Sequence, residues 1–180
     1  ALAEVVFVLP PVAAFGVAQR IPDTPLRNLA IRAAAERLAP SDLDSALAMI
    51  EELGPEADSA RAGLALAVAK SDTLKAFGLI ANLANTSVRR DALGLLLVQF
   101  SDSDLAAARS LLDNPETPAW ALPAYYGALA KTDIGAAFGE ADKIADPKYR
   151  SLALARVAQT AAPSSPELAE KILWEVMPED

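Results

Sequence analysis

The sequence contains neither cysteine nor histidine in its 180 residues. Without cysteine the chain has no disulfide framework, no thiol nucleophile and no thiolate metal site. Without histidine it lacks the commonest general base and the commonest metal ligand. Oxygen ligands alone can hold Ca²⁺ or Mg²⁺, but the carboxylates do not have the spacing of an EF-hand loop. We expect no metal and no cofactor, and both a cytoplasmic and a periplasmic localisation stay open.

Sequence motifs of independent catalysis are also missing. No serine lies in a G-x-S-x-G turn, and no glycine-rich phosphate loop is present. The densest acidic group comprises Glu51, Glu52, Glu56 and Asp58. It is expected at a helix end and in a loop, where carboxylates ordinarily form a solvated surface. The chain is therefore predicted not to be an enzyme, and no catalytic residue is assigned.

Aromatic residues are scarce, at 6 %, whereas hydrophobic residues reach 53 %. Alanine and leucine must therefore fill the core, and this composition favours helices over strands. Positive charge is also in short supply, because 16 Lys and Arg stand against 24 Asp and Glu, for a net charge of −8. Such a chain repels phosphate backbones, so we expect no nucleic-acid partner. A local basic patch stays open in the window 20–37, which carries four arginines against two acids.

Long hydrophobic runs are absent as well. Residues 5–19 carry no charge, but this stretch is shorter than the roughly 20 residues of a spanning helix, and Pro10-Pro11 interrupts it. The only early charge is Glu4, whereas a signal peptide starts with basic residues. We interpret residues 1–20 as an apolar N-terminal segment that caps the domain 21–180 as a helix or docking strand. The alternative is a membrane-proximal anchor or insertion into a partner, and a membrane contact is expected only through residues 1–20.

A Ser/Thr-Asp dipeptide recurs at nearly fixed intervals. The copies are Ser41-Asp42, Ser71-Asp72, Ser101-Asp102 and Thr132-Asp133, separated by 30, 30 and 31 residues. Each copy follows a predicted helix end and precedes an Ala/Leu-rich run, so it is expected to cap the next helix. At the third copy, both Asp102 and Asp104 are predicted to be caps. A period in this range is typical of stacked helical repeats.

Each repeat is predicted to hold two helices. The expected first helices start after the dipeptides and end near Leu53, Leu83, Leu112 and Ala141. The expected second helices cover about 58–70, 88–100 and 119–131, and the fourth follows a turn at Asp146-Pro147 and ends near Ala161. The segment 24–39 is predicted to be the second helix of an earlier unit, because residues 21–30 resemble 144–153 at an offset of 123. A last amphipathic helix is expected up to about Val176.

This pattern resembles α-solenoids of the tetratricopeptide or HEAT type, and more closely the Ala-rich helical repeats found in bacterial proteins, over about residues 20–177. No specific repeat family is identified from these residues. The resemblance implies an all-α fold, an α-α superhelix of about five two-helix repeats, which binds proteins or peptides on a curved surface.

Five residues are candidates for binding a partner. They are Trp120, Tyr125, Tyr126, Arg89 and Arg90. Trp, Tyr and Arg are the usual anchors of protein interfaces, although core packing is the ordinary role of aromatics in helical repeats. The two adjacent tyrosines point about 100° apart on a helix. We therefore expect that they are not both buried and that one is an exposed contact.

Arginines recur at the starts of the predicted second helices. Arg27, Arg89 and Arg150 hold this position, and an aspartate lies four residues before the first and the last of them. In the structural interpretation the arginine stem covers a turn and its head pairs with the local acid. In the functional interpretation these cations form a row for an acidic peptide, and Arg90 is the more available one.

Glycines within the predicted helices also need an explanation, because each costs roughly 1 kcal/mol relative to alanine. They are Gly63, Gly78, Gly94, Gly127, Gly135 and Gly139. We expect close helix–helix contact at these positions; a flexible hinge is the alternative.

The sequence as a whole predicts a non-catalytic protein–protein interaction scaffold or assembly subunit that presents a helical-repeat groove. A protein or peptide is the expected partner, and its identity and the oligomeric state stay open. The alternative is a helical scaffold within a larger enzyme, such as a lytic transglycosylase, whose catalytic domain lies outside this chain.

Overall fold

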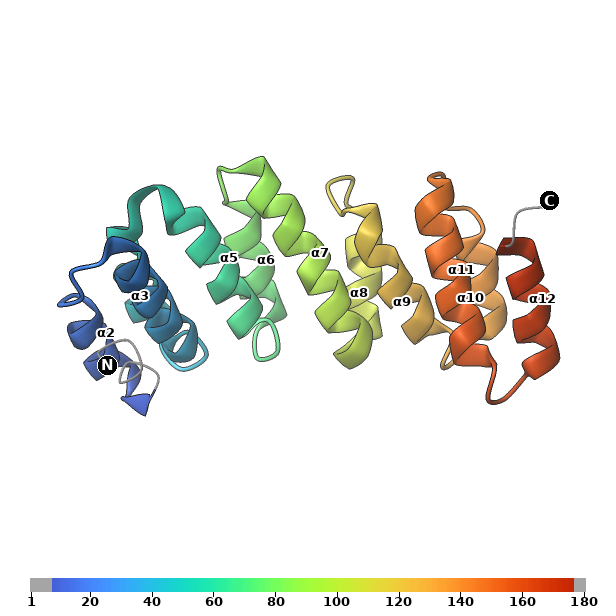
Figure 1. Cartoon of the computed structure of the whole chain (residues 1–180), viewed down its shortest axis with the longest axis horizontal. Helices are drawn as coiled ribbons and strands as arrows, with labels where there is room; N and C mark the ends of the chain where they lie inside the picture. The colour runs from blue at the N-terminus through green and yellow to red at the C-terminus, as the bar shows by residue number, and fades with distance from the viewer. Residues whose placement is uncertain (1–7, 177–180) are drawn as a thin grey trace. The chain divides into compact units, whose positions relative to one another are not determined.

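The computed structural model describes residues 8–176, and throughout this range the secondary structure is helical, without a strand. This confirms the predicted all-α class. The chain divides after Ala92 into two compact units. In Figure 1 the first unit runs from blue to green and the second from light green to red, and the boundary falls within the light-green α7.

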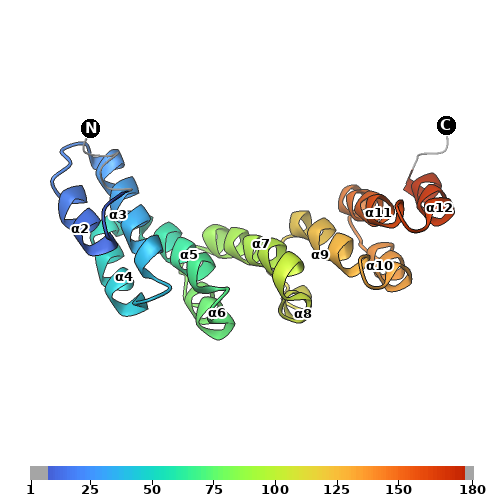
Figure 2. The ribbon, with the colours of Figure 1, turned by 90° about the horizontal axis from the view of Figure 1, so that it is seen from below.

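The first unit is built from helices that pack against their neighbours in the chain. It contains α2 (Pro11–Ala18), α3 (Thr24–Leu38), α4 (Leu43–Ile50), the 3₁₀ segment η1 (Glu51–Glu56), α5 (Ala57–Val68), α6 (Thr73–Ala81) and the start of α7 (Thr86–Ser103). α3 packs against α4 and α5, and α5 packs against α6. Within this unit α3 and α5 lie on one side and α4 and α6 on the other (Figure 2).

The second unit repeats this arrangement. It contains the rest of α7, then α8 (Leu105–Leu112), the 3₁₀ segment η2 (Ala119–Ala121), α9 (Leu122–Leu129), α10 (Ile134–Ala141), α11 (Pro147–Ala161) and α12 (Pro166–Val176). α9 packs against α8, α10 and α11, and α11 also packs against α12. In both units, therefore, a helix contacts the next helix in the chain and the one after it.

The predicted helices are present with small shifts at their ends. The segment 24–39 forms α3, and the first helix of the next unit ends at Ile50 rather than near Leu53. Chain reversal there uses Gly54, whose φ of +55° lies in the left-handed region that favours glycine. Pro55 follows Gly54, and α5 begins at Ala57.

Aspartates cap the first helix of each pair. Asp42, Asp72 and Asp133 each accept a hydrogen bond from the backbone N–H three residues later, at 3.0, 3.0 and 2.8 Å. These bonds satisfy donors that the first helical turn leaves without an intrahelical partner. The predicted capping by Ser/Thr-Asp is thus confirmed for these three copies.

Of the two caps predicted at the third copy, Asp104 is confirmed and Asp102 is wrong. Asp102 and Ser101 lie inside α7, which runs to Ser103, and the cap of α8 is Asp104, whose carboxylate accepts from Ala107 N at 3.0 Å. The buried Ser101 hydroxyl donates to Leu97 O at 2.6 Å, so this serine is satisfied within the helix and does not end it. The true third copy is therefore Ser103-Asp104, and the caps are spaced by 30, 32 and 29 residues.

Side chains of the preceding turn cap the starts of α3, α7 and α11. Asp23, Asn85 and Asp146 accept from backbone N–H groups two or three residues later, at 2.9 to 3.4 Å. Arg27 donates to Ile21 O at 3.4 Å and Arg89 donates to Leu83 O at 2.8 Å. The predicted pairing of Arg27 with the aspartate four residues before it is wrong, because that carboxylate accepts from the helix backbone and the guanidinium binds a carbonyl.

The apolar N-terminal segment is described only in part, since residues 1–7 lie outside the described range. Its remainder forms α2, which packs against α3 and buries Ala14 and Ala18, while Val8 and Val12 are exposed. Within residues 8–176 no helix combines the length and the apolar character needed to cross a membrane.

Candidate protein-binding surface

Trp120 is an exposed aromatic whose ring is fixed by backbone packing. It lies in η2, directly before α9, and is 40 % exposed. Its ring covers Gly94 of α7, where an added Cβ would fall 2.8 Å from Trp120 Cη2 and 2.7 Å from Pro118 Cγ. Only glycine leaves room for this contact. The indole is thus held against α7 on one side and remains accessible on the other.

Close contact is confirmed for three of the six predicted glycines. An added Cβ would meet Glu36 Cδ at 3.0 Å from Gly63, and Arg156 Cγ at 2.6 Å from Gly127; Gly94 is the third case. In each case a side chain from elsewhere in the same unit lies across the glycine. The prediction is wrong for Gly78 and Gly139, where nothing lies within 4 Å, and the Gly135 Cβ would meet only the nearby Asp133 carboxylate at 3.5 Å.

Tyr125 and Tyr126 are both buried, with exposures of 2 % and 7 %. The prediction that one of them is an exposed contact is therefore wrong. The physical reason is that α9 packs against α8, α10 and α11, so neighbouring helices cover both directions. The two rings contact each other edge to face, with centroids 5.2 Å apart and an interplanar angle of 77°.

Two residues that were not predicted hold this aromatic pair in place. Arg109 of α8 donates to Tyr125 Oη at 3.2 Å and forms an ion pair with Glu140 of α10. Hydrogen bonds to Tyr125 and Glu140 raise the pKa of Arg109, and burial followed by the Glu140 charge raises the pKa of Tyr126. The available signal was the 31-residue separation of Arg109 and Glu140, which matches the spacing of the Ser/Thr-Asp dipeptides.

A cleft of about 630 Å³ opens beside this network. Its lining comprises Arg109, Leu112, Ala119, Leu122, Tyr126, Glu140, Lys143, Ile144, Ala145 and Asp146. The two charged groups of the ion pair neutralise each other, and Asp146 caps α11. The polar groups of this cleft are therefore largely committed to the structure of the second unit.

The two arginine candidates belong to the first unit. Arg89 is half-buried and donates to Leu83 O, which ties the start of α7 to the preceding turn. Arg90 is exposed, as expected for the more available cation. The predicted aromatic residues belong to the second unit, where Tyr125 contacts Tyr126. The role of all five residues in binding stays a prediction.

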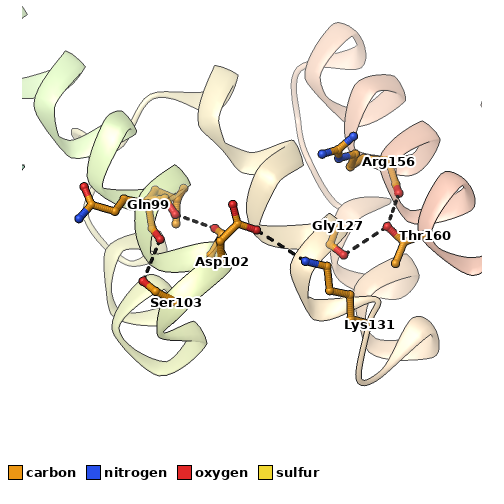
Figure 3. A network of polar contacts seen from close by, with 9 residues as sticks. Gln99, Asp102, Ser103, Gly127, Lys131, Arg156 and Thr160 are labelled. Atoms are coloured by element: carbon orange, nitrogen blue, oxygen red, sulfur yellow. Dashed lines mark hydrogen bonds and ion pairs between the residues drawn. The ribbon is translucent and has the colours of Figure 1, made fainter. Parts of the chain in front are cut away.

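A second, smaller cleft lies on the side of the second unit formed by α7, α9 and α11, and we call it the α9–α11 cleft (Figure 3). It has a volume of about 290 Å³ and is lined by Val98, Asp102, Ala124, Gly127, Ala128, Lys131, Arg156, Gln159 and Thr160. Two cations and one acid thus line this cleft.

Polar contacts connect the helices around the α9–α11 cleft. Lys131 Nζ lies 3.6 Å from the Asp102 carboxylate, which links α7 to the end of α9. The Thr160 hydroxyl lies 3.0 Å from Arg156 O and 3.4 Å from Gly127 O, within donating distance of both (Figure 3). The contact with Gly127 O connects α11 to α9, whereas the contact with Arg156 O lies within α11.

Acidic residues of the first unit have structural partners. Glu52 accepts from Gln19 Nε2 at 3.0 Å. Asp58 accepts from Arg61 at 3.2 Å and from Asn85 N at 2.8 Å, so one carboxylate ties α5 to the turn before α7. Among the described residues no group of three acids is placed to hold a metal ion.

Comparison with known proteins gives no relative: no protein-family model, no curated protein and no solved structure matches this chain.

Proposed function

We propose that this chain is a non-catalytic protein-interaction scaffold or assembly subunit, whose two-helix repeats stack as an α-solenoid and present a groove to a protein or peptide. The observation that carries the proposal is Trp120, an aromatic ring that is 40 % exposed although Gly94 and Pro118 fix one side of it. Rigid, partly exposed aromatics are the commonest anchors of protein interfaces, because little side-chain entropy is lost when a partner covers them.

Regular features of the helices support the repeat part of the proposal. The caps at Asp42, Asp72, Asp104 and Asp133 recur at intervals of 29 to 32 residues. Alternate helices pack against each other in both units, as α3 does with α5 and α9 with α11. In stacked repeats each element contacts only near neighbours, and this is the pattern expected of a solenoid.

A second exposed apolar side chain of the same unit supports the binding part. Leu95, the residue after Gly94 on α7, is 47 % exposed. A protein partner that covers Trp120 and Leu95 would remove this surface from water and gain the corresponding hydrophobic free energy.

Affinity purification from the native source, combined with chemical cross-linking and mass spectrometry, tests the proposal. We expect a stoichiometric partner that the wild type recovers and that Trp120→Ala loses. Trp174→Ala is the matched control, because Trp174 is also exposed, at 65 %, but lies on α12. Far-UV circular dichroism establishes that both variants are folded.

Two results would contradict the proposal. One is recovery of the wild type alone at native abundance, with cross-linkers of adequate reach. The other is equal recovery of the partner by Trp120→Ala and by wild type, which would mean that binding does not use this aromatic surface.

A further inference from the structure

The α9–α11 cleft lies beside a helix whose charge is opposite to that of the chain. The chain has a net charge of −8, yet α11 carries Lys148, Arg150 and Arg156 and not a single acid between Pro147 and Ala161. Of the residues that line the cleft itself, Lys131 and Arg156 are cations and Asp102 is the one acid. This surface therefore has a positive charge excess within an acidic protein, which favours an anionic occupant.

The two cations of the cleft are weakly engaged within the protein. The Arg156 guanidinium donates to the neutral Gln159 amide oxygen at 2.8 Å. Lys131 pairs with Asp102 at 3.6 Å, and the two side chains are 62 % and 77 % exposed. Exposed pairs of this kind contribute little to stability. Both cations can therefore bind an external carboxylate at small cost to the fold.

Gly127 determines where the Arg156 side chain lies. Because an added Cβ would come within 2.6 Å of Arg156 Cγ, only glycine allows the arginine stem to cross α9. The stem therefore lies against Gly127, and Gln159 and Thr160 add polar side chains to the lining of the cleft. Ala124, Ala128 and Val98 add apolar side chains to it.

We propose that the α9–α11 cleft binds a carboxylate-rich peptide segment, whose acidic side chains pair with Lys131 and Arg156 while its apolar side chains contact the alanine-lined wall. The inference rests on the proposed function and names the chemistry of its partner. An acidic peptide fits this cleft because Arg156 and Lys131 can form charge-assisted hydrogen bonds with its carboxylates. The cleft volume of about 290 Å³ accommodates small side chains.

Isothermal titration calorimetry of the full chain tests the inference with a defined probe. The probe is an acetylated and amidated peptide of about ten residues in which Glu and Leu alternate, and the control peptide has Gln in place of Glu. We expect the Glu peptide to bind and its affinity to fall with added salt, whereas the Gln peptide shows no binding.

Matched variants locate the site. Lys131→Gln and Arg156→Gln each remove one cation and keep most of the stem, and each is expected to weaken binding about fivefold. Lys171→Gln causes the same change in net charge on α12, outside the cleft, and is expected to leave the affinity unchanged within about twofold. Equal affinities for all three variants and wild type would overturn the inference, as would stronger binding of a single-stranded oligonucleotide than of the peptide.

The native partner separates this inference from the proposed function. If Arg156→Gln and Lys131→Gln still recover the partner as well as wild type does, the scaffold function stands and the acidic-segment inference fails. If wild type recovers no partner, the proposed function fails whatever the peptide titration gives.

Discussion

At the scale of single residues, small side chains determine which larger ones can lie across the helices. Gly94 leaves room for Trp120, whereas a glycine that no other group covers can be replaced by alanine without a clash. Gly94→Ala is expected to destabilise the protein by about 1–3 kcal/mol, because its Cβ overpacks against the indole and Pro118. Urea unfolding followed by circular dichroism measures this change.

Gly78→Ala is the matched control, since Gly78 lies within α6 and nothing is found within 4 Å of its added Cβ. Here alanine raises helix propensity, so we expect a stabilisation of about 0.5–1 kcal/mol. A similar destabilisation of both variants would show that the indole does not rest on Gly94.

Two capping carboxylates give the protein a defined acid response. Ser45 donates to Asp42 through its side chain and backbone, and the Lys75 backbone donates to Asp72, which lowers both pKa values below 3.8. A carboxyl whose pKa is lowered by folding stabilises the fold above its unfolded pKa, and this contribution is lost as the pH falls through the folded pKa. We therefore expect the free energy of unfolding to fall below about pH 4.

The Asp42→Asn/Asp72→Asn double variant removes these two titrating groups while retaining side chains that can cap a helix. Its free energy of unfolding should decrease less than that of wild type between about pH 6 and pH 3, as measured by urea unfolding at each pH. An identical decrease in both proteins would contradict the assignment of this acid response to the caps.

The aromatic residues show where sequence reasoning reaches its limit. The angle between Tyr125 and Tyr126 follows from helix geometry, but their burial depends on how many helices cover α9, and this is a property of tertiary packing. Arg109 was not singled out because nothing adjacent in the sequence marks it. Its partner Glu140 lies 31 residues later in the sequence and becomes a neighbour only through packing.

At the scale of helices, Asp104 rather than Asp102 is the residue that starts α8. Asp104→Ala is expected to lower the free energy of unfolding by about 1 kcal/mol, because the Ala107 N–H loses its acceptor. Asp102→Ala is the matched control two residues away. It removes only an exposed pair with Lys131, so a change within about 0.5 kcal/mol is expected in urea unfolding.

The opposite order of effects, with Asp102→Ala the more destabilising, would mean that α7 ends before Ser101, as its sequence suggests. The ambiguity has a local cause, because Ser101-Asp102 and Ser103-Asp104 are both Ser-Asp dipeptides. Capping preference alone cannot separate them. Burial of Ser101 at 6 % exposure selects the second, since the first would place the turn inside the core.

Most helix positions could be predicted because the turns carry strong signals. Gly54-Pro55 and the capping aspartates act locally, and the offset between residues 21–30 and 144–153 correctly located α3 and α11. The hydrogen-bond partners of Arg27 and Arg89 could not be predicted. A guanidinium can bind a carboxylate or a carbonyl, and Arg27 and Arg89 each bind the carbonyl six residues earlier, which comes within reach only once the turn before the helix has folded.

At the scale of the whole molecule, the proposed solenoid makes a prediction about how damage spreads. In stacked repeats, stability is a sum of local and nearest-neighbour terms. Asp133→Ala removes the cap of α10, so amide hydrogen exchange should become faster in α9, α10 and α11. Exchange in α4 and α5 should stay as in wild type, and mass spectrometry of exchanged peptides measures each helix.

A matching variant in the first unit, Asp42→Ala, provides the reciprocal control, because its effect should be confined to the helices around α4. Uniformly faster exchange throughout residues 8–176 in either variant would instead indicate one cooperative globule and would contradict the repeat proposal. Binding of a protein partner and the absence of catalytic activity stay predictions at this scale. Composition and helix pattern favour both, but they do not identify the partner.

The packing of Trp120 on Gly94 has a practical consequence, because it makes the indole an intrinsic optical reporter. Trp174 is the only other tryptophan in the chain, so Trp174→Phe leaves a single emitter. A ligand that displaces water from the exposed side of Trp120 would shift its emission to shorter wavelength, while the side against α7 stays unchanged. Libraries of unlabelled peptides can therefore be screened against the unlabelled protein, and the emission colour itself would report which of them reach this surface.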